Sequence, residues 1–496
     1  MNSFSRTDQA MSDCKHARPS MRSCLLACLL AGTFVACSSG PDPTYESKAK
    51  AVNAWSGKLE YGLNTDKASL SGWWKNLNDP KLNDLVERAI DQNLDLKVAM
   101  SRVREARQST IKTKAGFLPS ASAGGSLERT EASTSVDGFT LPDSTQDTGS
   151  LGLDASWEID LFGRVASSVD AAEADLAATV ESHYDAQITL LGEVARNYVQ
   201  LRMYQERVRL ANANINAQKR TYELTKTRHD LALASELELR QVEANVANSE
   251  STVPPLESGV AQSMNRLAVL LGEAPGALNK ELAEPKPVPA TPGEIAVGVP
   301  ADVIRRRPDI RQAERRLAAA SARVGVARAD LYPRLKLNGS LAFQATDAAN
   351  MFSLLTRSLS FGPSFQWNVF SGGSVRANIK IRQEQQEQAL LNYEKTMLSA
   401  LEEVENAMVA YAKEFDRRER LRQAAEASGR AVELSRDLYR EGVKDLLNVL
   451  HSERGMFDQQ DRFAQSEAEM TLALVRMYKA LGGGWEPIRE PVPQGN

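Results

Sequence analysis

Cysteine and histidine are the residues of this chain with the greatest capacity for chemistry. A cysteine thiolate is a nucleophile, and a histidine can transfer protons or bind a metal ion. All four cysteines lie within the first 37 of the 496 residues, there is no HExxH pair, and no glycine-rich phosphate loop follows an expected strand. The sequence therefore predicts neither an enzyme nor a metal or cofactor site. Beyond residue 37 the histidines are His183, His229 and His451.

The amino-terminal segment has the layout of a secretory signal. Arg18 and Arg22 precede the apolar run 25–31, and small residues follow it. This is the order of charged region, apolar core and cleavage site, and the run is shorter than the ~20 residues that a membrane-spanning helix needs. We expect residues 1–36 to be removed, which leaves Cys37 as the first residue. The alternatives are an uncleaved anchor, or a start at Met11 or Met21 instead of Met1.

The charge balance argues against a nucleic-acid partner. The net charge is −4 and the pI is about 5.9, with no basic stripe along the chain. A surface that follows phosphates needs a clear basic excess. Beyond Cys37 no stretch approaches 18 apolar residues, so any passage through a membrane must use β-strands.

The chain contains an internal repeat. Residues 115–119 (AGFLP) correspond to residues 329–333 (ADLYP) at a shift of 214 residues, and Trp157 corresponds to Trp367 at a shift of 210. Such self-similarity predicts two structural units with one plan. The expected segments are 37–80, a first repeat at 81–273, a linker at 274–300, a second repeat at 301–482 and a tail at 483–496.

Two segments in each repeat alternate apolar and polar residues. Leu151, Leu153 and Trp157 alternate with Asp154 and Glu158, which predicts a strand with one apolar and one polar face. Strands of about 10 residues with this alternation suit a transmembrane barrel. Because four strands cannot close a barrel and an open edge in lipid leaves backbone groups unpaired, copies of the chain must share one barrel. The expected strands are about 119–130, 149–160, 334–344 and 358–369.

Long stretches of good helix formers follow each pair of strands. Residues 193–253 contain no glycine or proline, and alanine, leucine, glutamate, glutamine and arginine dominate there. A helix over 164–230 would be about 100 Å long, and breaks near 231–234 and 441–444 make each stretch a hairpin. Hairpins packed side by side predict a tube. The expected long helices are about 164–230, 235–272 (interrupted by Pro254-Pro255), 374–440 and 445–480, and a shorter helix opens each repeat at Leu82 to about Lys114 and at Pro308 to about Leu331.

On particular motifs, the chain resembles the TolC-type outer-membrane factors, and most closely the lipoprotein branch of multidrug efflux (OprM-like, or NodT, family). The resemblance spans about residues 70–485. Its carriers are Gly72-Trp73-Trp74 with Asp79-Pro80-Lys81-Leu82, Asn265-Arg266-Leu267-Ala268-Val269-Leu270-Leu271-Gly272, Arg306-Arg307-Pro308-Asp309-Ile310, and Phe370-Ser371-Gly372-Gly373.

The resemblance implies an α+β fold, in which a duplicated unit of helix, two strands and long helical hairpin forms a homotrimer. A 12-stranded outer-membrane β-barrel is then continued by a periplasmic α-barrel, with residues 37–80 in the periplasm. The implied function is passive conduction of drugs or other small toxic compounds to the exterior. The implied partners are a periplasmic membrane-fusion adaptor, an inner-membrane efflux pump and outer-membrane lipid. The resemblance favours the RND type of pump.

The resemblance also assigns a lipidation site. Phe34-Val35-Ala36-Cys37 is similar to a lipobox, although Phe34 replaces the usual leucine. In such proteins the cysteine becomes the acylated first residue, and a residue such as Ser38 directs the protein to the outer membrane. The covalent lipid on Cys37 would be the only non-protein group.

The family's tips and closed end map onto five positions. Gly442 stands where the family's tip turn holds a glycine, and Ala232 takes that place in the first repeat. Both are candidate adaptor contacts, although turn formation alone explains Gly442. The family's gate is commonly narrowed by aspartates, and the matching positions here are Asn448 and His451, with Lys444 beside them. An imidazole ring carries less negative charge than carboxylates do; an exposed histidine without a gate role is the alternative.

Other conspicuous residues have structural interpretations. We expect Trp73 and Trp74 to pack against the body of the duct, and the run 305–307 of three arginines to be solvated or paired. The candidates for an interfacial aromatic belt, or for burial between barrel and helices, are Trp157, Phe361, Phe365 and Trp367.

Two other functions use similar sequence features. A duct for metal efflux or for type I protein secretion would share the architecture. A non-conducting periplasmic coiled-coil scaffold would share the helices, but it has no use for four alternating strands placed symmetrically in two halves.

Overall fold

The computed structural model describes residues 54–56, 61–66, 70–132, 135–136, 139–140, 144–346, 353 and 355–485. All of them belong to one compact unit, Glu46–Asn496. Cys37 and the expected signal peptide lie outside the described residues. None of the described helices combines the length and the apolar composition needed to cross a membrane.

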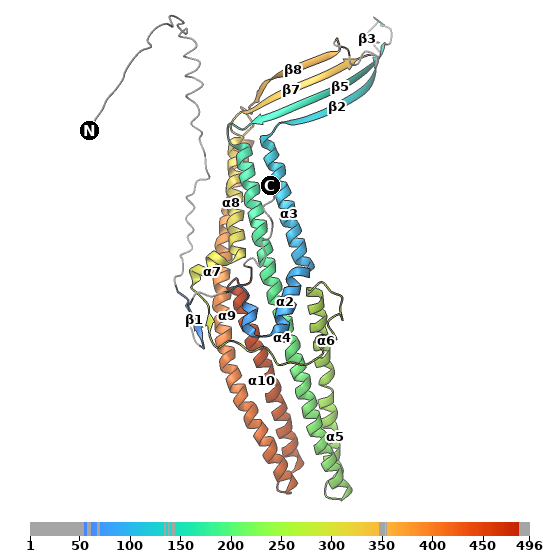
Figure 1. Cartoon of the computed structure of the whole chain (residues 1–496), viewed down its shortest axis with the longest axis vertical. Coiled ribbons are helices and arrows are strands. Elements are labelled where there is room, and N and C mark those ends of the chain that lie inside the picture. Colours follow the sequence, from blue (N-terminus) through green and yellow to red (C-terminus); the bar gives the residue numbers. More distant parts are fainter. Residues whose placement is uncertain are drawn as a thin grey trace, which may run out of the picture. The chain divides into compact units, whose positions relative to one another are not determined.

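The same order of elements occurs twice along the chain (Figure 1). The first half consists of α2 (Pro80–Gln92), α3 (Leu94–Lys114), β2 (Ser120–Ala132), β5 (Ser144–Ile159), α4 (Arg164–Asp230), α5 (Glu236–Glu250) and α6 (Val253–Leu270). The second half consists of α7 (Pro300–Arg306), α8 (Pro308–Ala329), β7 (Arg334–Ala345), β8 (Arg357–Gln366), α9 (Ser374–Arg440) and α10 (Leu446–Ala480). The short elements are β1 (Leu63–Asn64), η1 (Trp73–Leu77), η2 (Ala115–Phe117), β3 (Ser135–Val136), β4 (Phe139–Thr140) and β6 (Ile295–Ala296).

Several bounds differ from those expected. The opening helix of the first repeat is two helices, because Asn93 leaves helical geometry and its side chain accepts a hydrogen bond from Leu96 N, which starts α3. The helix expected at 235–272 is α5 and α6, which break at residues 251–252, just before the proline pair. Strand β5 begins at Ser144 instead of about 149, since all of β2 pairs with residues 144–156 of β5. Strand β8 ends at Gln366, three residues early.

The four long strands form one antiparallel sheet in the order β2-β5-β7-β8, at the end of the helices opposite the hairpin tips (Figure 1). The register places the apolar side chains on one face, where Leu359, Phe361 and Phe365 are 71–77% exposed. Trp157 and Trp367 are also exposed, so the single chain does not bury the candidate aromatic belt between sheet and helices. The two indoles donate to equivalent carbonyls, Phe117 O at 2.9 Å and Leu331 O at 3.0 Å.

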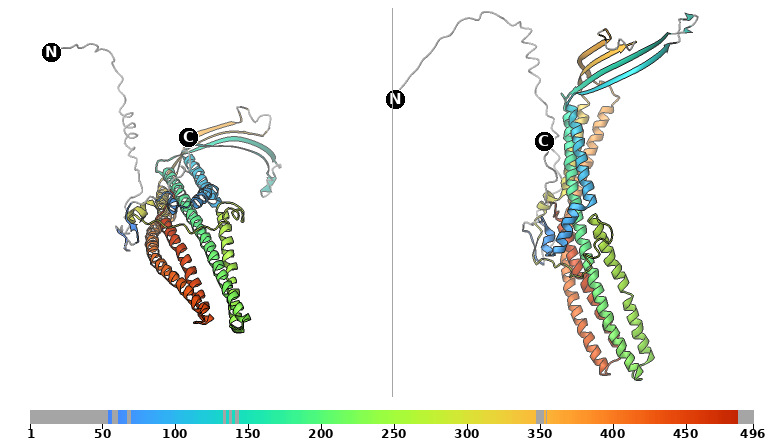
Figure 2. Two further views of the ribbon diagram at one scale, coloured as in Figure 1. Left: turned by 60° about the horizontal axis from the view of Figure 1, so that its bottom comes forward. Right: turned by 45° about the vertical axis from the view of Figure 1, so that its right-hand side comes forward.

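The helices pack around α4, which contacts α3, α5, α6, α8 and α10, while α9 packs against α8 and α10. Both 67-residue helices follow a glycine with positive φ, Gly163 before α4 and Gly373 before α9. The hairpins α4–α5 and α9–α10 reach the same end of the unit, far from the sheet (Figure 2). The largest apolar core lies midway along the helices, where Trp73 and Trp74 are 1% exposed and Trp73 stacks on Tyr478. The two tryptophans therefore pack into the body, as predicted.

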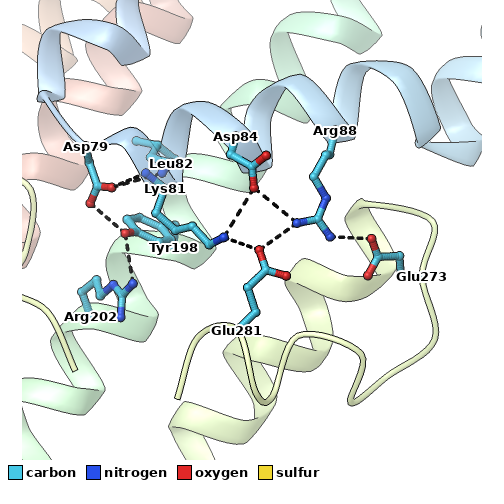
Figure 3. Close-up of polar contacts among 9 residues, drawn as sticks. All are labelled: Asp79, Lys81, Leu82, Asp84, Arg88, Tyr198, Arg202, Glu273 and Glu281. Carbon is cyan, nitrogen blue, oxygen red and sulfur yellow. Dashed lines mark hydrogen bonds and ion pairs between the residues drawn. The ribbon is translucent and has the colours of Figure 1, made fainter. Parts of the chain in front are cut away.

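Helix α2 is fixed to α4 by a polar network around its first turn (Figure 3). The Asp79 carboxylate caps α2 by accepting from the backbone N–H groups of Lys81 and Leu82. The Tyr198 hydroxyl of α4 donates to the same carboxylate at 2.7 Å, and Arg202 donates to that hydroxyl at 3.1 Å. Burial and then the bond to Asp79 raise the pKa of Tyr198, so the hydroxyl remains a donor.

Ion pairs fix the other end of α2 to the segment after α6 (Figure 3). The Arg88 guanidinium lies 2.6 Å from Glu273 and 2.8 Å from Glu281. Burial alone would lower the pKa of Arg88, but the hydrogen bond to Glu273 and the charge of Glu281 outweigh it and raise that pKa. The first repeat is thereby tied to the start of the linker.

A pair of equivalent contacts joins the first and last helix of each repeat. The Asn93 side chain donates to Leu270 O, at the end of α6, at 2.9 Å. Arg307 occupies the position equivalent to Asn93 at a shift of 214 residues. It donates to Ala480 O, at the end of α10, at 2.8 Å. Leu270 and Ala480 are themselves equivalent at a shift of 210. We call these two contacts the repeat clasps.

The glycine that follows each clasped helix end has no room for a side chain. Gly272 and Gly482 have φ of 74° and 73°. A Cβ at Gly272 would lie 2.8 Å from Gln92 O, and one at Gly482 would lie 2.9 Å from Arg307 Cγ. These glycines therefore allow the close approach on which the clasps depend.

Candidate functional site

The two hairpin tips are built in the same way. In the first, Ala232 N donates to His229 O at 2.8 Å and the next N–H donates to Arg228 O at 2.7 Å. In the second, Gly442 N donates to Tyr439 O at 3.0 Å and the next N–H donates to Leu438 O at 2.9 Å. These are the two bonds of a Schellman motif, which needs a left-handed residue. Ala232 supplies it with φ of 58° and Gly442 with φ of 76°.

The alanine makes the first tip the strained one, because a Cβ is disfavoured in the left-handed region. We expect Ala232→Gly to stabilise the chain by about 1 kcal/mol and Gly442→Ala to destabilise it by about 1 kcal/mol. Guanidinium unfolding followed by circular dichroism measures both variants. Two changes of the same sign would contradict the shared turn geometry.

The returning helices begin with equivalent capping residues. Ser235 and Glu238 form a capping box at the start of α5. Asp445 caps α10 by accepting from Asn448 N at 3.3 Å, and the Asn448 amide also donates to that carboxylate. The structure thus places Asn448, a predicted gate residue, within the helix cap.

The other predicted gate residues surround this cap. Lys444 is exposed in the turn before α10, and His451 is exposed one turn beyond Asn448. The three histidines are not brought together. His183 is buried in α4, where burial lowers its pKa, and His229 lies in the first tip, 3.3 Å from Glu236.

Two polar contacts that join the hairpins above the tips were not predicted. The Arg228 guanidinium of α4 donates to Tyr439 O of α9 at 3.1 Å and lies 4.7 Å from the centre of its ring. Further from the tips, Glu453 of α10 is fully buried. It accepts hydrogen bonds from Thr221 of α4 at 2.9 Å and from Arg436 of α9 at 2.7 Å. Glu453 therefore joins three helices.

One sequence signal could have identified Glu453. Leu446 and Val449 are buried in α10, and Glu453 continues their helical spacing. A carboxylate in line with core positions indicates a buried, paired group. The apolar cluster beside it consists of Val242, Tyr439, Leu446 and Val449.

Comparisons with known proteins give one consistent result. The family model described as outer membrane efflux protein matches residues 85–273 and 299–483. Nodulation protein T of Rhizobium leguminosarum bv. trifolii is 32% identical over 84% of this chain and 88% of its own length. The pyoverdine export outer membrane protein OpmQ of Pseudomonas aeruginosa is 33% identical over 94% of this chain and 98% of its own length. Among solved structures, the outer-membrane channel OprN has a TM-score of 0.82 and 36% identity, covering 91% of this chain and 100% of that one.

Proposed function

This chain belongs to the outer membrane efflux protein family, and we propose that three copies of it form the exit channel of a tripartite efflux system. Each copy contributes four strands to one 12-stranded barrel and two hairpins to an α-barrel in the periplasm. The channel passes drugs or other small toxic compounds outward, and lipid on Cys37 anchors each copy to the outer membrane.

The observation that carries this proposal is the sheet. It has two open edges, β2 and β8, together with one apolar and one polar face. Open edges in lipid leave backbone N–H and C=O groups without partners. Pairing β8 of one copy with β2 of the next satisfies both edges and keeps the antiparallel order, and three copies paired in this way give the 12 strands that we propose.

An apolar stripe on α9 supports the same assembly. Leu391, Leu398, Val409 and Leu434 are 51–62% exposed. Their spacings of 7, 11 and 25 residues are close to whole turns of a helix with ~3.6 residues per turn, so they lie on one side of α9. Neighbouring copies packed into an α-barrel would cover this stripe.

The start of α10, just beyond the second tip, lines the periplasmic gate in this proposal, with Lys444 beside it. The contacts of Arg228 and Glu453 hold the two hairpins together, and Asn448 and His451 face the narrow end. Ala232 and Gly442, at the turns, are the positions where the adaptor docks, and the inner-membrane pump of the RND type supplies the energy.

We expect His451→Ala to increase the conductance of the purified trimer in planar bilayers, because three imidazoles no longer narrow the gate. His229→Ala, in the first tip, is the matched control and should leave conductance unchanged. An unchanged conductance for His451→Ala would remove His451 from the gate.

Deleting the gene and complementing it tests the function. The deletion strain should become sensitive to dyes, antibiotics or solvents, and the intact chain should restore resistance. Sensitivity to metals alone would favour a metal-efflux duct, and a secretion defect without any change of resistance would favour protein export. No phenotype in any of these assays would contradict the proposal.

A further inference from the structure

One face of the sheet is lined by polar groups that bond to one another. Ser340 Oγ and Ser360 Oγ are 2.8 Å apart. Ser156 Oγ donates to Asn338 Oδ1 at 3.0 Å, and Asn338 Nδ2 donates to Ser364 Oγ at 2.7 Å. These uncharged side chains serve as hydrogen-bond partners for one another. This part of the face is therefore polar and compatible with water, but uncharged, whereas Glu158 and Lys336 lie one row beyond Ser156.

Asp154 interrupts this neutral face. In register it lies opposite Ser122 on β2 and Ser340 on β7, and a cavity of about 310 Å³ lies over these residues. In the rows of paired residues from Ser156 to Ser150, all side chains on this face except that of Asp154 are uncharged. The carboxylate is exposed, and within the described part of the chain no hydrogen bond or ion pair to it is found.

The same strand carries a second aspartate on the opposite face. Asp147 lies an odd number of residues from Asp154 and shares its face with Leu151 and Leu153. Its carboxylate pairs with Arg129 of β2 at 2.8 Å. The charge of Asp147 is thus compensated by a neighbour, whereas that of Asp154 is not.

We propose that Asp154 is a specificity-determining residue of the channel. This inference rests on the proposed barrel, which turns the polar face towards the lumen. Three copies then place three carboxylates at one level of a wall that is otherwise uncharged from the row of Ser156 to the row of Ser150, and they favour cationic over anionic solutes there. Because the Debye length is about 10 Å at 0.1 M salt and about 30 Å at 0.01 M, the preference grows as the salt concentration falls.

Thiol labelling at Ser340 tests the proposal locally. The chain has no cysteine beyond Cys37, so Ser340→Cys is the one free thiol of the lipidated protein in vesicles. Cationic trimethylammonium-ethyl and anionic sulfonatoethyl methanethiosulfonates are applied at low salt. The ratio of cationic to anionic labelling rates should fall about fivefold or more on adding Asp154→Asn, because a carboxylate about 5 Å away attracts one reagent and repels the other.

Asp147→Asn is the matched control, since it removes a carboxylate from the same strand on the opposite face, and it should leave the ratio unchanged. If Ser340→Cys is labelled and Asp154→Asn does not change the ratio, Asp154 has no role in selectivity and the barrel stands. If Ser340→Cys is not labelled while Leu341→Cys is, the proposed barrel itself is wrong.

Discussion

Replacing Glu453 by alanine should raise the conductance of the proposed trimer and lower the free energy of unfolding by about 2–3 kcal/mol. Glu453 is 0% exposed and joins Thr221 of the first hairpin to Arg436 of the second. Its loss leaves Arg436 without its charge partner. Because the Arg436 side chain is 30% exposed and can reach water, the expected loss of stability is smaller than the about 3–5 kcal/mol of a fully buried pair that loses one partner.

The matched control for Glu453→Ala comes from the repeat itself. Glu243 is the same residue type at the equivalent position of α5, but it is exposed, and among the described residues its ion-pair partner is Arg240 on its own helix. Glu243→Ala should change stability by less than about 0.5 kcal/mol and leave conductance unchanged. Bilayer recordings and guanidinium unfolding measure both variants. Equal effects of the two substitutions would show that Glu453 does not hold the hairpins together.

Arg307→Ala should destabilise the chain by about 3 kcal/mol. Its guanidinium is buried and donates to Ala480 O at 2.8 Å, to both carboxylate oxygens of Asp309, and to Glu403 at 2.8 Å. Burial alone would lower its pKa, but the bond and charge of Asp309 outweigh that effect and raise it. The substitution removes the clasp of the second repeat and leaves two carboxylates with fewer partners.

Two comparisons separate the clasp from the general loss of an arginine. Asn93→Ala removes the uncharged clasp of the first repeat and should cost about 1–2 kcal/mol. Arg305→Ala removes an exposed arginine two residues away and should cost less than about 0.5 kcal/mol. The midpoints of guanidinium-induced unfolding of the purified variants rank their stabilities. An Arg305→Ala effect as large as that of Arg307→Ala would contradict the role given to the clasp.

The long helices could be predicted because composition alone decides them. Helix α4 spans Arg164–Asp230, a stretch with no glycine after Gly192 and no proline. The break at Asn93 has a local cause, the cap on Leu96 N, and a tertiary one that no local pattern indicates: the same side chain bonds to Leu270 O, which is 177 residues away in the chain. Similarly, β5 begins early because of its partner strand β2.

The candidate site was predictable in position but not in chemistry. The repeat locates both turns, and it matches Ala232 with Gly442. Alanine disfavours the left-handed backbone conformation, so the sequence around Ala232 does not predict it. The positive φ of Ala232 matches that of Gly442 in the equivalent turn of the second repeat. The contact of Arg228 with Tyr439 joins helices from different repeats, so no local pattern indicates it.

Oxidative cross-linking between strand edges tests the closed three-copy barrel most directly. Ser360→Cys on β8 is combined in turn with a cysteine at Ser122, Gly124 or Ser126 on β2, and the chain has no other thiol beyond Cys37. A disulfide forms only where the two Cα atoms are about 4.4–6.8 Å apart, so the scan finds the register between copies. The account predicts a covalent species of three chains for at least one pair. Single chains, or pairs of chains only, at every position would contradict it.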